Sequence, residues 1–308
     1  MNYTVALTGA TGFIGNRVAR QLVANGCKLK ALTRATSDRS RLAGVNIHWV
    51  EGTLEDLGSL RCLVRGADAV VHCAGAVRGA TQEHFNQINV DGVERLVRAA
   101  TEQHPLPRFL LMSSLAAREP DLSPYANSKY QGEAALAAQA GPMSWTVLRP
   151  SAVYGPGEKE MQPLLRWMAR GIAFVLGSGD GRFSMLYVDD LVEAIQKWLL
   201  KDGLPKKAFE LHDGQPGGYS WKDVIDAVGG LNAKRVQCLH IPVTGLKTAA
   251  RLNLITARLL GYAPMFTPGK LRELRHPDWV CDNAAFMQET GWTPRVSLEE
   301  GLKRTLEL

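Results

Sequence analysis

LTGATGFIG, residues 7–15, sets three glycines in the pattern G-x-x-G-x-x-G. The run Thr4–Leu7 before it predicts a strand, and the apolar stripe Val18–Val23 after it predicts a helix that ends at Gly26. A glycine-rich turn from strand to helix gathers backbone N–H groups at a positive helix end, where a phosphate binds favourably. Such turns also occur for packing alone, so the rest of the chain has to decide between these two interpretations.

The composition is that of an ordinary globular protein. Its 308 residues are 45% hydrophobic and 21% charged, enough for one large domain or for a domain with a substantial appendage. No segment approaches ~18 uninterrupted apolar residues, and the N-terminus carries no basic leader. These features predict a cytoplasmic protein with no integral membrane segment.

Cysteine, histidine and charge patterns argue against several kinds of site. The five cysteines include no C-x-x-C pair and the seven histidines no ligand spacing, so we expect reduced thiols and no metal site. The net charge of +6 comes from dispersed Lys and Arg rather than from a basic face interleaved with aromatics, so no nucleic-acid partner is expected. A charge of this sign aids solubility and attracts anionic ligands.

Short β-branched runs alternate with helical stretches through the first 150 residues. This alternation predicts an α/β fold with a parallel sheet covered by helices on both faces. From about Tyr154 the pattern loosens, and a second, smaller region is expected. The predicted strands are Thr4–Leu7, Lys28–Leu32, Ile47–Val50, Ala69–His72, Phe109–Met112 and Thr146–Leu148, and two helices are predicted at PLLRWMARGI (163–172) and VDDLVEAIQKWLL (188–200).

Eight further motifs follow the glycine-rich turn in order along the chain. They are GTLED (52–56), VVHCAG (70–75), NVDG (89–92), MSS (112–114), YANSK (125–129), RPSAVYGPG (149–157), YVDD (187–190) and TGWTPRVSLEEGL (290–302). Each is weak alone, but the ordered set resembles the short-chain dehydrogenase/reductase superfamily, specifically its extended branch, the NAD-dependent epimerase/dehydratase family. The resemblance covers nearly the whole chain.

The resemblance implies a domain organisation. A Rossmann-type, doubly wound NAD(P)-binding domain is expected over 1–154 and 185–212, with a smaller C-terminal substrate-binding region over 155–184 and 213–308. Relatives often dimerise through helices that here would span about Gln87–Glu102 and Tyr125–Gln139, which makes a homodimer a candidate assembly.

Tyr125 is the only tyrosine that has a lysine four residues later. This spacing places Tyr125 and Lys129 on one face of a helix, about 5–6 Å apart at Cβ. A phenol with a pKa near ~10 is a weak base at neutral pH, and a neighbouring ammonium favours its phenolate. By the resemblance, Tyr125 is the general acid/base, Lys129 also holds the nicotinamide ribose, and Ser114 orients the reacting oxygen.

The cofactor contacts are also implied by the resemblance. Thr33 and Arg34 stand where relatives that prefer NAD carry an acidic residue, and a guanidinium suits a 2′-phosphate, so NADP is preferred over NAD. The alternative is that Arg34 is a solvated loop charge. Leu54 is expected under the adenine, and Cys73 as a small filler. The implied cofactor residues are Gly9, Thr11, Gly12, Phe13, Ile14, Gly15, Arg34, Leu54, Cys73, Ala74, Gly75, Ser113, Tyr125, Lys129, Pro150, Ser151 and Val153.

The substrate region departs from the nucleotide-sugar members of the family. Those members carry an arginine that meets the diphosphate five residues before the valine of the YVDD-type motif, and here that position holds Phe183. Arg182 would point to the opposite face of a strand. Arg272 and Arg275 remain candidates for an anion site. The stretch 246–266, LKTAARLNLITARLLGYAPMF, predicts an amphipathic helix that either caps an apolar substrate or packs on the core.

The sequence therefore predicts an NAD(P)-dependent oxidoreductase that transfers a hydride at a secondary alcohol or ketone of a small-molecule substrate. A nucleotide-sugar 4-epimerase or dehydratase that recycles its bound cofactor is the alternative. A non-catalytic dinucleotide-binding protein is a third hypothesis, against which the complete set of Ser114, Tyr125 and Lys129 argues. The sequence does not identify the substrate.

Overall fold

The computed structural model describes residues 3–175, 181–233 and 235–307. The chain divides into two compact units, the first comprising residues 1–149 and 192–209 and the second residues 150–191 and 210–308. Helix α7 (Val188–Leu200) and strand β11 (Ala208–Leu211) each contribute residues to both units. The division predicted from the sequence is one of function, into a cofactor-binding domain and a substrate-binding region, with boundaries near residues 154, 185 and 212. That assignment of roles stays a prediction.

A seven-stranded sheet organises the first unit, in the order β11-β6-β5-β4-β1-β2-β3. The strands from β3 to β6 pair in parallel, as their β-branched and apolar runs predicted. Strand order reverses between β1 and β4, which is where an open α/β sheet forms a ligand crevice at the carboxyl ends of its strands. The bounds are β1 Thr4–Thr8, β2 Lys28–Thr33, β3 Ile47–Glu51, β4 Ala69–His72, β5 Arg108–Met112 and β6 Trp145–Pro150.

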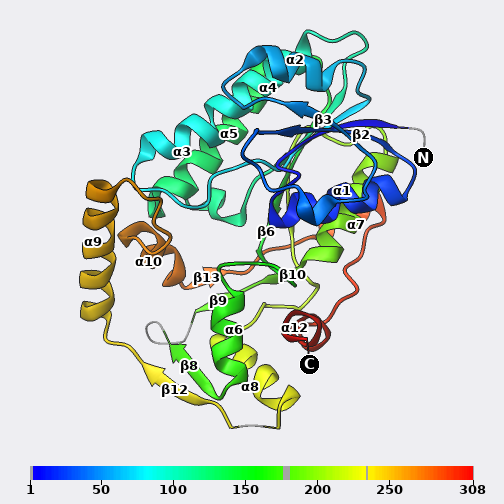
Figure 1. Cartoon of the computed structure of the whole chain (residues 1–308). Helices are drawn as coiled ribbons and strands as arrows, with labels where there is room; N and C mark the ends of the chain where they lie inside the picture. The colour runs from blue at the N-terminus through cyan, green and yellow to red at the C-terminus, as the bar shows by residue number, and fades with distance from the viewer. Residues whose placement is uncertain (1–2, 176–180, 234, 308) are drawn as a thin grey trace. The chain divides into compact units, whose positions relative to one another are not determined.

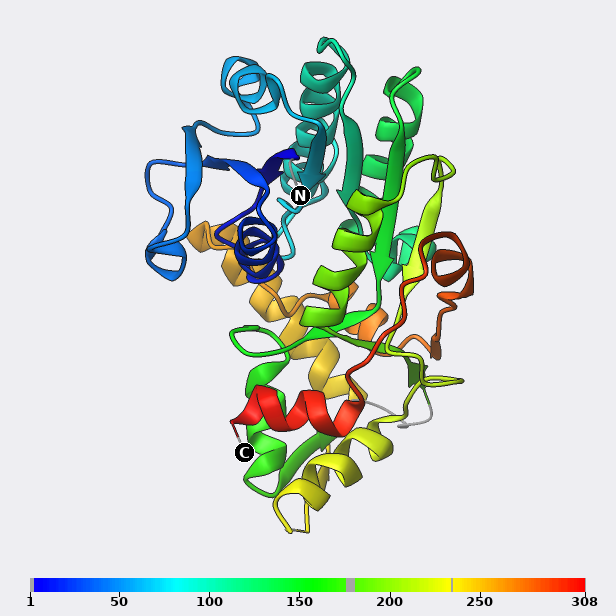
Figure 2. The same ribbon diagram turned by 90° about the vertical axis from the view of Figure 1, so that its right-hand side faces the viewer.

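Helices cover both faces of this sheet, so the doubly wound α/β fold is confirmed. Helices α1 and α7 lie on one face, and α2, α4 and α5 on the other (Figures 1 and 2). Buried leucines such as Leu63, Leu96 and Leu136 fill the second interface against Phe109 and Val147 of the sheet. The bounds are α1 Phe13–Ala24, α2 Leu57–Val64, α3 Gln82–Asn89, α4 Asp91–Thr101 and α5 Pro124–Gln139.

One predicted helix is divided in the structure. The stretch expected to run from Gln87 to Glu102 is broken at Val90, which joins α3 to α4. The preceding residue, Asn89, is buried and bonded through its side chain to two other segments, and this fixes the end of α3. The helix predicted over Tyr125–Gln139 is found as α5, which begins one residue earlier.

The second unit is built from short strand pairs and peripheral helices. Its parallel pairs are β10 with β7, β12 with β8 and β13 with β9. No helix within the described residues is long and apolar enough to cross a membrane. The bounds are β7 Ala152–Tyr154, α6 Gln162–Ala169, β8 Ile172–Val175, β9 Arg182–Phe183, β10 Met185–Tyr187, α8 Trp221–Leu231, β12 Gln237–His240, α9 Val243–Leu260, α10 Pro268–Leu274, β13 Asp278–Trp279, α11 Ala284–Thr290 and α12 Leu298–Leu306.

Candidate active site

The glycine-rich turn lies between β1 and α1, against the turn that follows β4. Gly9 has a φ of +75°, and a Cβ there would lie 2.6 Å from the backbone nitrogen of Ala74. A Cβ on Gly15 would lie 2.1 Å from the carbonyl oxygen of Gly9. Side chains at these positions would collide with backbone, so the glycines are required by close approach at the switch point of the sheet.

The N-terminus of α1 is arranged to receive an anion. The helix begins at Phe13 after Gly12, with no side chain capping its first turn and no acidic residue within it. Thr11, Phe13 and Ile14 are half-buried around this end. This helix end is uncapped and positively polarised, and the glycine turn beside it leaves space that any side chain would fill. The arrangement fits the pyrophosphate of a dinucleotide.

Hydrogen bonds hold the β1 and β4 ends together. Thr8 Oγ1 lies 2.6 Å from His72 Nδ1, and the backbone N–H of Ala74 donates to Thr8 Oγ1 at 3.3 Å. Burial, with the charge of Lys129, lowers the pKa of the His72 imidazole to about 3. Burial also raises the pKa of the Cys73 thiol to about 12. Both groups are therefore neutral at pH 7, and Cys73 has the character of a filler rather than a nucleophile.

Tyr125 and Lys129 lie one turn apart at the start of α5. Ser123 caps this helix by accepting the N–H of Ala126 at 3.0 Å, and Pro124 occupies its first position. Tyr125 is half-buried, with its ring edge-on to Phe85 at a centroid separation of 6.0 Å. The sequence spacing has thus become a shared helix face, as predicted.

Lys129 is buried, and its Nζ donates to the carbonyl oxygen of Met112 at 3.1 Å, at the end of β5. A Cβ on Gly75 would lie 3.0 Å from the same Nζ, so the ammonium also borders the turn after β4. Burial lowers the pKa of Lys129 to about 8, and the negative charge of Glu133 opposes that shift.

The two serines after β5 occupy different environments. Ser114 is half-buried and begins a short 3-10 helix, Leu115–Arg118, where its Oγ accepts the N–H of Ala116 at 3.2 Å. Its hydroxyl hydrogen is a separate donor. Ser113 is buried, and its Oγ is hydrogen-bonded to Oε1 of Glu133.

Glu133 is a site residue that the sequence reasoning missed. It is buried one turn beyond Lys129 on α5, and the Arg149 guanidinium binds it from β6. Its position at i+8 from Tyr125 and i+4 from Lys129 was the available signal, since these three residues share a helix face.

Asn89, the first residue of the NVDG motif, braces the site. Its Nδ2 donates to Ser128 Oγ at 2.9 Å and to the carbonyl oxygen of Ala76 at 3.0 Å. Its Oδ1 accepts the N–H of Ala76 at 2.9 Å. The side chain therefore joins α3, α5 and the turn after β4.

At the far side of the cradle, Arg34 is exposed directly after β2. Its positive charge is near enough to Glu55 to contribute to the lowered pKa of that carboxyl, whose largest cause is a hydrogen bond with Thr53. Leu54 packs beside α4, where a Cβ on Gly92 would meet it at 3.0 Å.

The remaining predicted cofactor residues belong to the second unit. Pro150 and Ser151 are buried, and the N–H of Ser151 donates to the carbonyl oxygen of Leu211 at 3.0 Å. Val153 pairs with Leu186 in the β7–β10 ladder. These contacts fix the segment within its unit.

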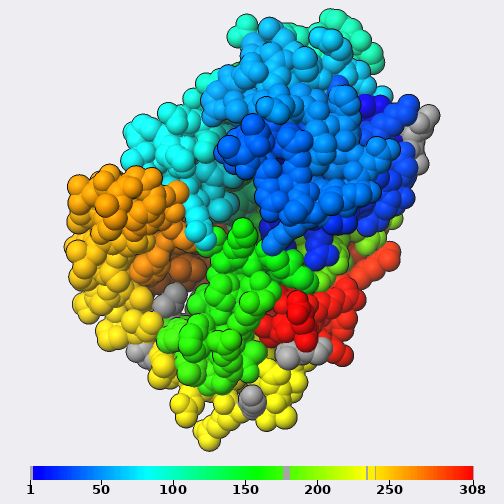
Figure 3. Space-filling model, viewed as in Figure 1, coloured from blue at the N-terminus to red at the C-terminus, as the bar shows by residue number. Residues whose placement is uncertain are grey.

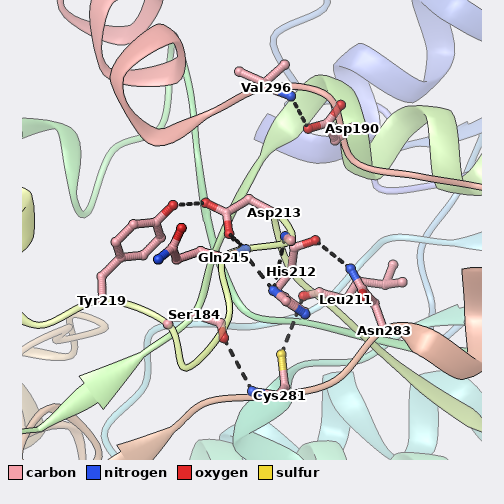
Figure 4. Close-up of polar contacts among 12 residues, drawn as sticks. Ser184, Asp190, Leu211, His212, Asp213, Gln215, Tyr219, Cys281, Asn283 and Val296 are labelled. Carbon is pink, nitrogen blue, oxygen red and sulfur yellow. Dashed lines mark hydrogen bonds and ion pairs between the residues drawn. The ribbon is translucent and has the colours of Figure 1, made fainter.

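The YVDD motif and the late TGWTPRVSLEEGL motif are structurally linked in the second unit. Oδ2 of Asp190 accepts the backbone N–H of Val296 at 3.0 Å (Figure 4). The same oxygen accepts the backbone N–H of Arg295 at 3.1 Å, and the Trp292 indole donates to the Asp190 carbonyl oxygen. These two motifs therefore hold the chain before α12 in place.

A second polar cluster in this unit follows β11, and the sequence reasoning did not identify it. Tyr219 Oη donates to Oδ2 of Asp213 at 2.7 Å, and Nδ2 of Asn283 donates to the carbonyl oxygen of His212 at 2.9 Å (Figure 4). Burial raises the pKa of the Asp213 carboxyl, and the hydrogen bond from Tyr219 opposes that shift. This cluster ties two loops of the second unit together.

Arg182 and Phe183 are both engaged within the second unit. The Arg182 guanidinium donates to the carbonyl oxygens of Gly217 at 2.6 Å and Gly218 at 2.8 Å. The ring centroids of Phe183 and Trp221 lie 4.9 Å apart. A pocket of about 710 Å³ beside Arg182 contains none of the predicted catalytic or cofactor residues. Its charged lining consists of Arg182, Asp223, Asp226 and Glu299, an excess of negative charge that disfavours a diphosphate.

The fold and the glycine cradle define a dinucleotide-binding α/β protein of the extended short-chain dehydrogenase/reductase type. The sequence signature of the NAD-dependent epimerase/dehydratase family matches residues 5–211, and the chain belongs to this family. It is therefore an NAD(P)-dependent oxidoreductase of the epimerase/dehydratase type.

Two reductases match this chain along most of its length. Ceramide reductase of Caulobacter vibrioides is 33% identical over 303 residues, which cover 98% of this chain and 93% of that protein. 2-alkyl-3-oxoalkanoate reductase of Stenotrophomonas maltophilia is 28% identical over 334 residues, 97% of each chain. Among solved structures, UDP-glucose 4-epimerase of Thermotoga maritima shares the fold, with a TM-score of 0.78 at 22% identity over 100% of this chain and 98% of that one.

Proposed function

We propose that this protein is an NADP(H)-dependent reductase that interconverts a ketone and a secondary alcohol and releases its cofactor after each turnover. The observation that carries the proposal is the placement of Lys129, which is buried one turn after Tyr125 with its ammonium on the Met112 carbonyl at the end of β5. A buried cation on the same helix face as a half-buried phenol favours proton transfer from that phenol to a carbonyl oxygen.

The first unit supplies the groups that would hold the cofactor. The cradle of Gly9, Gly12 and Gly15 fits its pyrophosphate, and Arg34 would receive the 2′-phosphate that distinguishes NADP from NAD. Lys129 would hold the nicotinamide ribose. When bound, NADP(H) supplies or accepts the hydride.

Three side chains of the first unit would take part in proton transfer to the substrate oxygen. Tyr125 donates its phenolic proton to that oxygen during reduction and recovers it in the reverse direction. Lys129 stabilises the phenolate left behind, because its ammonium lies on the same helix face. Ser114 donates its hydroxyl hydrogen to the reacting oxygen while its Oγ accepts the Ala116 N–H.

We propose a substrate with alkyl chains. The two full-length relatives named above are a ceramide reductase and a 2-alkyl-3-oxoalkanoate reductase, and both names describe reductases of molecules that carry such chains. The second unit, with the region 155–184 and 213–308, is proposed to contribute the substrate-binding residues.

The alternative, a nucleotide-sugar 4-epimerase or dehydratase, is disfavoured by two residues. Phe183 stands where those enzymes carry their diphosphate-binding arginine, and its ring packs on Trp221. Arg182 cannot readily replace that arginine, because its guanidinium already donates to two backbone carbonyls.

We propose a cytoplasmic homodimer formed through α4 and α5. The scattered spacing of the five cysteines, with no C-x-x-C pair, favours a reducing compartment. Light scattering of the purified chain tests the dimer: a monomer mass at micromolar concentration would contradict it.

The reaction class is tested by NADPH consumption. We expect purified protein to oxidise NADPH in proportion to an added long-chain 3-oxo compound, and to exchange bound for free dinucleotide in solution. UDP-galactose is the comparison substrate and should remain unchanged. Interconversion of UDP-galactose and UDP-glucose with retained cofactor and no net loss of reduced nicotinamide would support the epimerase instead.

A further inference from the structure

Helix α9 is fixed to its unit by one face. Leu246, Ala250 and Ala257 are buried, and α9 packs beside α10 at the edge of the second unit (Figures 1 and 3). The side chain of Asn253 donates to the carbonyl oxygen of Phe266 at 2.7 Å, which secures the turn after the helix. The stretch 246–266 was expected either to cap a substrate or to pack on the core. One face of α9 does pack on its own unit.

The opposite face of α9 carries an apolar stripe. It consists of Leu252, Ile255 and Leu259, which are 58%, 54% and 80% exposed. The spacing i, i+3, i+7 places all three on one side of the helix, roughly opposite the buried residues. Leu260 and Tyr262, 73% and 41% exposed, continue the apolar surface at the C-terminal end of α9.

A basic strip runs beside the apolar stripe. It consists of Lys247, Arg251 and Arg258, all exposed on the flank of the same helix. Residues 227–272 contain seven Lys or Arg and no Asp or Glu, whereas the chain as a whole has 30 acidic residues. The segment that contains the exposed apolar stripe therefore has a net positive charge and no acidic side chain.

We propose that α9 docks on the surface of an anionic lipid bilayer, with its axis in the plane of the interface. An exposed apolar stripe flanked by cations is the pattern of a helix that inserts its leucines between lipid headgroups while its basic side chains meet anionic phosphates. Long Lys and Arg stems let the charges reach the headgroups while the leucines enter the acyl boundary. Tyr262 lies where interfacial aromatics are favoured.

A second copy of the chain is the other candidate occupant of this face. Pairing of α9 with its counterpart about a two-fold axis would bring six cations of the two basic strips into one interface, and α9 supplies no carboxylate to neutralise them. Charge complementarity therefore favours an anionic surface.

The experiment is co-sedimentation of the full chain with vesicles. Wild-type protein is expected to sediment with mixed phosphatidylcholine–phosphatidylglycerol vesicles at low salt, and to be released by high salt or in pure phosphatidylcholine. The variant Leu252→Ser/Leu259→Ser is expected to lower partitioning by roughly tenfold or more. Its matched control is Leu200→Ser, a leucine of similar exposure on α7.

The charge contribution is tested by a second pair of variants. Arg251→Gln/Arg258→Gln should also lower partitioning roughly tenfold, whereas Lys28→Gln/Lys201→Gln, which removes the same net charge from exposed positions elsewhere, should lower it little. Unchanged thermal unfolding would show that every variant is folded. The assay contains neither cofactor nor ketone, so its result is independent of the proposed reductase activity.

Three results would overturn the proposal. In the first, wild-type protein stays in the supernatant with anionic vesicles. In the second, the α9 variants and the control variants reduce vesicle binding equally. In the third, the protein does not bind vesicles and forms a dimer that Leu252→Ser/Leu259→Ser dissociates. The last result would assign the apolar stripe to self-association.

Discussion

Arg149 binds both carboxylate oxygens of Glu133: its Nε lies 2.9 Å from Oε1 and its Nη2 lies 2.5 Å from Oε2. The pair connects the end of β6 to the middle of α5, and Ser113 shares the same carboxylate. Glu133 thereby joins the segment after β5, which carries the serines, to the helix that carries Tyr125 and Lys129.

Loss of the Glu133 charge is expected to destabilise the fold. Glu133→Gln leaves the Arg149 guanidinium without its bidentate carboxylate in a mostly buried site, and the free energy of unfolding should fall by about 3 kcal/mol. Urea denaturation measures this change. Glu102→Gln, which breaks the exposed Arg61–Glu102 pair, is the matched control and should change stability little. Equal losses in the two variants would contradict a special role for Glu133.

Cofactor affinity is expected to depend on the charge of Lys129. Because burial lowers its pKa to about 8, NADPH affinity should fall as the pH rises through that value. Lys129→Met should bind weakly with no such transition, while Lys30→Met, which alters another lysine of the first unit, should keep it. Fluorescence titrations with NADPH across the pH range measure both, and a transition that survives in Lys129→Met would exclude Lys129 as its source.

The same pKa has a consequence for stability, with a definite sign. The folded-state pKa lies below the ordinary lysine value of 10.5, so the unfolded chain binds more protons between the two values. The penalty of burying the ammonium is complete below pH 8 and is relieved as the pH rises toward 10.5. The wild type should therefore lose less stability over this interval than Lys129→Met does, as denaturation at several pH values would reveal.

Removal of the Tyr125 hydroxyl should abolish proton transfer and leave cofactor binding intact. Tyr125→Phe keeps the ring packed on Phe85, so dinucleotide affinity should stay near that of the wild type while kcat falls by roughly a hundredfold or more. Tyr130→Phe, an exposed tyrosine on the same helix, should leave both unchanged. Turnover near the wild-type rate in Tyr125→Phe would remove Tyr125 from the mechanism.

Arg34 is expected to set the cofactor preference. NADPH should bind more tightly than NADH, and Arg34→Ala should narrow the difference by roughly 1–3 kcal/mol, the value of a charge-assisted contact to phosphate. Arg41→Ala, an exposed arginine later in the same connection, is the control and should preserve the difference. Calorimetry that finds NADH the tighter ligand of the wild type would reverse the assignment.

The first half of the fold was predictable because its signals are local. All six predicted strands are present with small differences at their ends, since each is a short run rich in apolar or β-branched residues in a parallel sheet. The short strands of the second unit were not predicted. Pairs such as β9 with β13 bring together residues almost a hundred positions apart, and two-residue strands carry no periodicity.

The parts of the site that depend on sequence spacing were predictable. The parts that depend on tertiary contacts were not. Tyr125 and Lys129 share a helix face by their spacing, but the contact between Lys129 and Met112 depends on how α5 packs against β5. Glu133 was missed because its partner Arg149 is sixteen residues away, on a different element. The amphipathic pattern of α9 was evident, but which leucines it exposes depends on the position of α10.

The fate of the hydride tests the central claim, net reduction of a ketone by NADPH, most directly. Wild-type protein is incubated with NADPH deuterated at the transferring position of nicotinamide C4 and a long-chain 3-oxo compound, and the product is examined by mass spectrometry and NMR. The reductase account predicts one deuterium at the new carbinol carbon for each NADPH consumed, and none with Tyr125→Phe under the same conditions. A nucleotide sugar that is interconverted without taking up deuterium, while the labelled NADPH and the ketone remain unchanged, would contradict the account.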